Sequence, residues 1–219
     1  MLILTCGAVL YGQTADSGTE KQAFHWLALG DSYTIGASVK AAERFPAQTA
    51  RHIQNRFQKE TDIDYMAATG WTSEDLQDAL ANSDLKQHYD WVTLLIGVND
   101  QYQGLDTGGY RTRFTQLLKT ALRLVQGNKE RVCVMSIPDY SATPFGRGSG
   151  SIHREIANFN RINYDIACQY QVGYCDITGI SQTAAGNPSL TAMDHLHPSG
   201  KQYQLWAMKL FERMSRLFQ

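Results

Sequence analysis

Five short apolar runs recur along the chain, and longer stretches with helical spacing of apolar residues separate them. Within each run the residues are almost continuously apolar, which is typical of parallel strands covered on both faces. The runs are FHWLALG (24–30), DIDYMAA (62–68), DWVTLLIG (90–97), RVCVMSI (131–137) and VGYCDI (172–177). This pattern predicts five β-strands.

The stretches between the runs predict helices over about residues 45–60, 73–81, 110–126, 152–170 and 200–219. Thr72 or Ser73 is the expected cap of the second helix, and Ser199 with Gln202 has capping-box spacing before the last. Regular alternation of strands and helices predicts an α/β fold, with an open parallel sheet between two layers of helices. In such folds the ligand crevice lies outside the carboxyl ends of the strands.

The N-terminus has a different character. It is apolar from Leu2 to Leu10 and then becomes polar. Such a run is too short to span a bilayer but fits the apolar part of a secretory signal, with Gly12 as the expected cleavage site, although the basic start of a signal is missing. An ordinary first strand and a lipoprotein signal modified at Cys6 are the alternatives. We therefore expect residues 1–20 to be a signal peptide or disordered N-terminus, residues 21–219 to form one domain, and the protein to be exported to the periplasm or secreted, with a cytoplasmic location as the alternative.

The charge balance argues against two classes of partner. The 20 Lys and Arg residues and 21 Asp and Glu residues give a net charge of −1, and the basic residues are scattered. No basic field is present to attract nucleic acid or an anionic membrane, and no stable membrane insertion is expected. A small-molecule substrate fits this composition better.

The four cysteines do not indicate a metal site, because no C-x-x-C or Cys/His spacing typical of zinc occurs. Cys133 lies in an apolar run and is expected in the core. Cys168 and Cys175 flank a short turn and could form a disulfide in an oxidising compartment, which their spacing alone does not decide.

Residues with catalytic chemistry follow the predicted strands. Parallel strands bring their carboxyl ends to one edge, so residues far apart in sequence are expected to meet there. They are Ser32 after the first strand, Gly70 after the second, Asn99 after the third, and Asp194 and His197 before the last helix.

Acyl transfer requires this set of groups. Ser32 would be the nucleophile and His197 the base that takes its proton, since a serine hydroxyl is a poor nucleophile alone. Asp194, on what we expect to be one helical turn with His197, would orient the imidazole. The backbone N–H groups of Ser32 and Gly70 and the side-chain amide of Asn99 would bind the oxyanion.

Four sequence blocks resemble those of the SGNH (GDSL-type) hydrolases. They are GDSYTIG, ATGWTSEDL, GVND and DHLHPSG, which place the four name-giving residues at Ser32, Gly70, Asn99 and His197. The resemblance runs from about residue 24 to the C-terminus and departs in the first block, where Tyr33 replaces leucine. It implies a flavodoxin-like three-layer α/β/α fold, no metal or organic cofactor, and hydrolysis of esters or related acyl bonds.

Several residues have competing interpretations. Ser32 alone could be a helix N-cap, with Asp31 as an acceptor that steadies the turn. His195 is adjacent to Asp194 and would point away from the face of residue 197, so we favour His197 as the base. Candidate substrate-lining residues, for which loop packing is an equal alternative, are Trp71, Gln101, Tyr102, Tyr140 and Phe145. The loop 143–151 either covers the site or is a plain solvent loop.

The sequence therefore favours a cofactor-independent serine esterase acting on small or medium acyl esters, with acetylated carbohydrate as one candidate. A lysophospholipase or thioesterase is the alternative within the class. Two other classes stay open: a non-catalytic α/β module that binds a small polar ligand, and a metal-dependent hydrolase using Asp31, Asp194, His195 and His197. An α/β-hydrolase is disfavoured because no G-x-S-x-G motif occurs.

Overall fold

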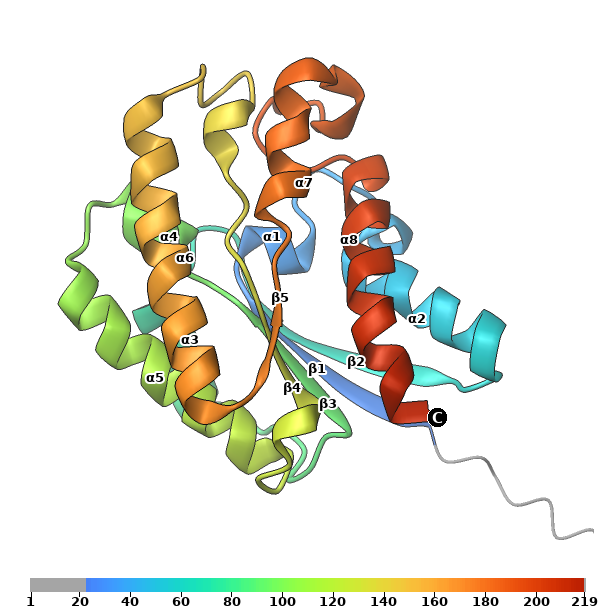
Figure 1. The fold of residues 1–219 in the computed structure, drawn as a ribbon. Helices are drawn as coiled ribbons and strands as arrows, with labels where there is room; N and C mark the ends of the chain where they lie inside the picture. Colours follow the sequence, from blue (N-terminus) through green and yellow to red (C-terminus); the bar gives the residue numbers. More distant parts are fainter. Residues whose placement is uncertain (1–22, 219) are drawn as a thin grey trace, which may run out of the picture.

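The computed structural model describes residues 23–218 of the protein, so the predicted signal segment lies outside the described residues. Its five strands form one parallel sheet in the order β2-β1-β3-β4-β5 (Figure 1). The strands are β1 (Phe24–Gly30), β2 (Thr61–Ala67), β3 (Trp91–Leu95), β4 (Val132–Met135) and β5 (Gly173–Cys175). The predicted five-stranded parallel sheet is confirmed.

Strand β1 is the centre of the molecule. Its register places Trp26 opposite Ile63 of β2 on one side and Trp91 of β3 on the other. Leu27 and Leu29 are fully buried, because helices cover both faces of the sheet. A run that is apolar except at His25, rather than an alternating one, follows from this position.

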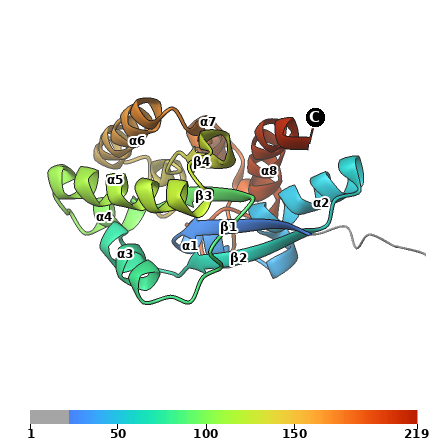
Figure 2. The same cartoon turned by 90° about the horizontal axis from the view of Figure 1, so that it is seen from below.

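Helices form a layer on each face of the sheet (Figures 1 and 2). One layer contains α2 (Phe45–Phe57) and α8 (Gly200–Met214), which pack against each other. The opposite layer contains α3 (Ser73–Ala81), α5 (Thr107–Leu124) and α6 (Gly150–Tyr170). The three-layer α/β/α architecture expected from the sequence is therefore present.

Local chemistry explains where helix ends differ from the predicted bounds. Helix α2 ends at Phe57 rather than residue 60, because Gln58 adopts a left-handed conformation with φ of 53°. Helix α5 begins at Thr107 rather than residue 110, because the Asp106 side chain accepts the N–H of Gly109 and caps the helix. Thr72 caps α3 as expected, in a capping box with Asp75.

Three short helices have no counterpart in the apolar pattern: α1 (Ser32–Ile35), α4 (Val98–Tyr102) and α7 (Thr178–Gln182). Each follows the carboxyl end of a strand (Figure 1). The chain passes from β1 outward to β2 and then returns to β3 on the other side of β1. This reversal makes a topological switch point between β1 and β3, where doubly wound sheets bind their ligands.

The cysteines of the described chain are unpaired. Cys133 and Cys175 are buried, Cys168 is exposed, and all three carry free thiols. The structure therefore does not contain the disulfide between Cys168 and Cys175 that the sequence left open. In residues 23–218 no helix has the length and apolar character needed to cross a bilayer.

Candidate active site

The turn from β1 into α1 places Ser32 on the wall of a cavity. Asp31, not Ser32, is the N-cap of α1, since its Oδ1 accepts the N–H of Tyr33 at 2.9 Å. Ser32 is then the first residue of the helix, where a backbone N–H has no intrahelical acceptor. Gly30 is required before the turn, because a Cβ there would lie 2.3 Å from the carbonyl oxygen of Leu95.

Asp31 is a buried carboxyl group. It has no exposed surface, and its Oδ2 has no hydrogen-bond partner. Burial raises its pKa to about 8, and the charge of Asp100 adds to this effect, while the N–H of Tyr33 opposes it. Asp31 is therefore protonated near neutral pH, and it stabilises the turn without placing a charge under Ser32.

The turns after β2 and β3 meet at the same edge. The Asn99 Nδ2 donates to the backbone carbonyl of Trp71 at 2.9 Å, which leaves its second amide hydrogen unused. Gly70 has a φ of +86°, which favours glycine, although a Cβ would meet no atom within 4 Å. The N–H groups of Ser32 and Gly70 donate to no other residue of the described chain.

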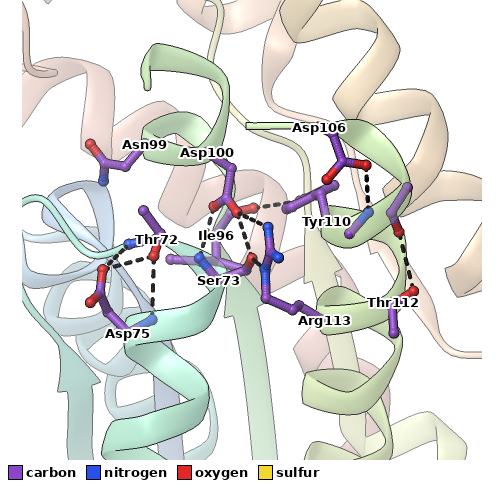
Figure 3. Close-up of polar contacts among 12 residues, drawn as sticks. Thr72, Ser73, Asp75, Ile96, Asn99, Asp100, Asp106, Tyr110, Thr112 and Arg113 are labelled. Atoms are coloured by element: carbon purple, nitrogen blue, oxygen red, sulfur yellow. Dashed lines mark hydrogen bonds and ion pairs between the residues drawn. The ribbon is translucent and has the colours of Figure 1, made fainter. Parts of the chain in front are cut away.

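A buried polar network holds these two turns together (Figure 3). The Asp100 carboxylate, with no exposed surface, accepts the Ser73 N–H at 2.8 Å and the Ser73 hydroxyl at 2.5 Å. Arg113 of α5 donates to the same hydroxyl at 2.8 Å and to Asp100 at 3.3 Å. Asn99 and Gly70 are one and three residues from members of this network, so it fixes the separation between their segments.

His197 and Asp194 form a hydrogen-bonded pair in which His197 Nδ1 lies 2.6 Å from Asp194 Oδ2. The expected helical turn between them is wrong. The segment is a tight turn in which Asp194 Oδ1 accepts the backbone N–H groups of Leu196 and His197, at 3.0 and 2.9 Å. The carboxylate thus organises its own loop, and Nε2 of His197 is the ring nitrogen left for another partner.

Asp194 is held in its ionised form. Burial acts to raise its pKa, but hydrogen bonds from the Ser38 hydroxyl, the two backbone N–H groups and His197 outweigh burial and keep the pKa well below the usual range. Ser38 donates to Oδ2, the same oxygen that His197 contacts. Nothing in the sequence pattern pointed to Ser38, which lies 156 residues from Asp194.

A single cavity of about 310 Å³ joins the expected catalytic residues. Ser32, Gly70, Asn99 and His197 all line it. No hydrogen bond joins Ser32 Oγ to His197, a contact that in many enzymes shortens only with substrate bound. The rest of its wall is mostly apolar or aromatic and consists of Tyr33, Thr69, Val98, Tyr102, Tyr140, Phe145 and Leu196.

Three of the five candidate substrate-lining residues lie on the cavity wall: Tyr102, Tyr140 and Phe145. The structure places Trp71 and Gln101 elsewhere. The Gln101 side chain is buried, donates to Glu155 at 2.7 Å and accepts the Tyr140 hydroxyl at 2.9 Å. Gln101 therefore supports Tyr140 instead of contacting the cavity.

The loop 143–151 lies beside the site and is tied to it. The N–H of Phe145 donates to the backbone carbonyl of His195 at 3.0 Å. His195 is exposed, has a φ of 63°, and lines a neighbouring groove rather than the cavity of His197. Between residues 23 and 218 no three His, Cys, Asp or Glu side chains are arranged to hold a metal, so the ligand set of the metal-dependent alternative is not formed.

Comparison with known proteins identifies the family. Residues 28–205 match the model of the GDSL-like lipase/acylhydrolase family. The chain belongs to this family. The four blocks recognised in the sequence are therefore blocks of a GDSL-type hydrolase, and the protein is a hydrolase of this family. No curated protein matches the chain in sequence.

Three solved structures of a lipase/acylhydrolase, an esterase and a lipase have the same fold. A lipase/acylhydrolase from Enterococcus faecalis superimposes with a TM-score of 0.70 at 19% identity, over 88% of this chain and 96% of that chain. Axe2, an acetylxylan esterase from Geobacillus stearothermophilus, gives 0.66 at 20% identity, over 90% and 96%. The lipase Lip_vut3 from a goat rumen metagenome gives 0.72 at 18% identity, over 87% and 97%. At these identities the likeness concerns the fold.

Sequence reasoning missed the aromatic contact to the histidine. Tyr33, the residue that departs from the GDSL pattern, packs its ring edge-on against His197 with centroids 5.6 Å apart. Its backbone carbonyl accepts the hydroxyl of the buried Tyr203 at 2.9 Å. Tyr33 is thus part of the support of His197, a role that its position beside Ser32 in the sequence did not suggest.

Proposed function

We propose that the protein is a cofactor-independent serine ester hydrolase that forms an acyl-enzyme on Ser32. The observation that carries this proposal is the single cavity lined by Ser32, Gly70, Asn99 and His197, with His197 hydrogen-bonded to Asp194. At this cavity an ionised carboxylate holds a histidine, and the serine hydroxyl has no hydrogen-bond partner in the described chain. A module that only binds a ligand would not need this combination.

In the acylation step, Ser32 Oγ attacks the ester carbonyl carbon while Nε2 of His197 accepts the hydroxyl proton. Asp194 holds Nδ1 and stabilises the imidazolium that forms. The negative charge on the carbonyl oxygen is bound by the N–H groups of Ser32 and Gly70 and by the free amide hydrogen of Asn99. The C–O bond then breaks, and His197 returns its proton to the departing alcohol.

In the deacylation step, His197 removes a proton from water, which attacks the acyl carbon of the ester on Ser32. The same three donors bind the second oxyanion. When this intermediate collapses, the Ser32 oxygen leaves with the proton held by His197, and the carboxylic acid is released. The free enzyme is restored without a cofactor.

The lining and the volume of the cavity support the proposed class of ester. Its lining has no Asp, Glu, Lys or Arg, which supports a neutral group as its occupant. The volume of about 310 Å³ suits a small or medium acyl group. An acetylated carbohydrate fits, as does a longer acyl chain of a lysophospholipid or thioester extending past the exposed Tyr102 and Phe145. We also propose that the protein is exported and that its substrate is extracellular or periplasmic.

Labelling of Ser32 by a fluorophosphonate tests the catalytic proposal. We expect one adduct per chain, mapped to Ser32 by peptide mass spectrometry, with loss of ester hydrolysis in proportion. Ser32→Ala should abolish both, and Ser215→Ala, which removes a hydroxyl bonded to the Glu212 carbonyl at the end of α8, should change neither. A wild-type protein that remains unlabelled would indicate a binding module, and activity lost in EDTA and restored by a divalent ion would indicate a metal-dependent hydrolase.

A panel of p-nitrophenyl esters of graded acyl length, with acetylated sugars beside it, tests the substrate class. Small and medium acyl groups should give the highest kcat/KM. A preference for long chains would favour the lysophospholipase or thioesterase alternative.

A further inference from the structure

Ser38 has a backbone conformation that favours glycine, yet its side chain makes a hydrogen bond to another segment. Its φ is +64°, in the left-handed region that favours glycine and disfavours residues with a Cβ. The residue present instead carries a hydroxyl, and this hydroxyl donates to Oδ2 of Asp194. A side chain kept in a disfavoured conformation, with its polar atom on the carboxylate of a catalytic pair, suggests a role for that atom.

The donors to Asp194 come from two places. The backbone N–H groups of Leu196 and His197 and the His197 ring belong to the same tight turn as Asp194. Ser38 is the one donor from outside this turn in the described part of the chain. The local bonds fix Asp194 relative to His197, so Ser38 alone ties the carboxylate to a different segment.

That different segment is the turn of the proposed nucleophile. The backbone carbonyl of Ser32 accepts the N–H groups of Gly36 and Ala37, each at 3.0 Å, which brings the chain back before Ser38. A short series of hydrogen bonds therefore runs from Ser32 through the turn to Ser38, Asp194 and His197. Because no hydrogen bond joins Ser32 directly to His197 across the cavity, their relative position depends on such supports.

We propose that Ser38 is a positioning residue, whose hydroxyl fixes Asp194, and through it His197, relative to Ser32. This inference rests on the proposed function. Ser38 does not line the cavity, so it acts on the rates of acylation and deacylation, which both use His197, and not on substrate binding.

Two substitutions separate the hydroxyl from the backbone. Ser38→Ala removes the hydroxyl and keeps the Cβ, whereas Ser38→Gly removes the hydroxyl and suits a positive φ. Both should lower kcat by about ten-fold, the effect of one hydrogen bond to a carboxylate at a partly exposed site, with KM unchanged. Both should also slow fluorophosphonate labelling of Ser32 by the same factor. The control Ser215→Ala, which removes a hydroxyl that bonds the carbonyl of Glu212, should change neither rate.

The Asp194→Asn background tests whether Ser38 acts through Asp194. There, Ser38→Ala should cause no further loss, because residues that act through one another are not additive. Proton NMR gives a readout independent of turnover: the low-field signal of the hydrogen bond between His197 and Asp194 should shift or broaden in both Ser38 variants and not in Ser215→Ala.

Wild-type rates in both Ser38 variants, together with an unchanged low-field signal, would overturn the proposal. So would a loss in Ser38→Ala that Ser38→Gly restores, because the backbone would then be the cause. Failure of the proposed function looks different: the wild-type protein would neither hydrolyse esters nor accept the label at Ser32, whatever the residue at position 38.

Discussion

Ser73 and Asp100 are joined by two hydrogen bonds, one from the Ser73 N–H at 2.8 Å and one from its hydroxyl at 2.5 Å. They link the start of α3, just after Gly70, to α4, which contains Asn99 (Figure 3). Two of the three proposed oxyanion donors are therefore held at a fixed separation by a carboxylate that itself faces no substrate.

We expect Asp100→Asn to lower kcat by roughly 10–100-fold with little change in KM, since small displacements of catalytic groups have effects of this size. The two oxygens of the Asp100 carboxylate accept the N–H and the hydroxyl of Ser73, and an asparagine would offer only one oxygen to these two donors. The free energy of unfolding should therefore fall by about 2–4 kcal/mol. Steady-state kinetics and urea unfolding measure both effects. Asp165→Asn, which breaks an exposed ion pair with Arg161, is the matched control and should alter neither by more than about 0.5 kcal/mol. Normal kcat in a folded Asp100→Asn would show that the network does not position the donors.

Asn99→Ala should raise the barrier by about 2.7–4 kcal/mol, the range for loss of one oxyanion donor, and the loss should be in kcat. Steady-state hydrolysis of a p-nitrophenyl ester measures it. Asn128→Ala is the control, because its side chain caps a 3-10 turn away from the cavity. An unchanged rate in Asn99→Ala would contradict the oxyanion assignment.

His197→Ala should reduce kcat more than Asp194→Asn does, on the order of 10⁶-fold against 10⁴-fold if the losses resemble those of a known serine protease. An asparagine at 194 keeps one acceptor oxygen for the N–H groups of Leu196 and His197, so the turn survives while the charge is lost. Single-turnover kinetics with an activated ester can follow both variants. Equal losses would mean that the carboxylate is as essential as the base.

The stability of the protein should depend on pH through Asp31. The pKa of the Asp31 carboxyl group is about 8 in the folded chain and 3.8 without burial. At a pH between these two values, the group therefore binds a proton when the chain folds. The contribution of this group to the free energy of unfolding therefore falls as pH rises from about 4 to 8. An asparagine in place of Asp31 has no such proton to take up and keeps an acceptor for the Tyr33 N–H.

We therefore expect Asp31→Asn to be more stable than wild type at pH 8, by a margin of several kcal/mol that shrinks towards pH 4. Urea unfolding at several pH values measures the margin. Asp84→Asn, at an exposed position, should show no such trend. A margin that grows as the pH falls would mean that Asp31 is ionised in the folded protein.

The sequence predicted the sheet and the long helices because these elements are defined by burial along the chain. Strand β1 is apolar except at His25, and α5 has a continuous apolar stripe. The short helices α1 and α4 have only four and five residues, too few to show a period, and are set by turn chemistry at strand ends. The rule that parallel strands gather ligands at one edge then placed Ser32 and Asn99 together.

Contacts between distant side chains were not predictable in the same way. Asp194 and His197 are three residues apart, so their pairing could be proposed locally, although the turn type was not. Ser38 and Asp194 are separated by 156 residues, and no spacing indicates their bond. Neighbours on a short helix also differ: Tyr102 lines the cavity while Gln101 turns to Glu155, because successive helical side chains point in different directions.

The central claim is that Ser32 carries the acyl group during turnover, and rapid-quench mass spectrometry of the intact protein tests it most directly. An activated ester mixed with the enzyme and quenched in acid within the first turnover should add the mass of one acyl group, and peptide mapping should place it on Ser32. The adduct should be absent from Ser32→Ala. Full turnover without any adduct on residue 32, or with the same adduct in the Ser32→Ala protein, would contradict the account.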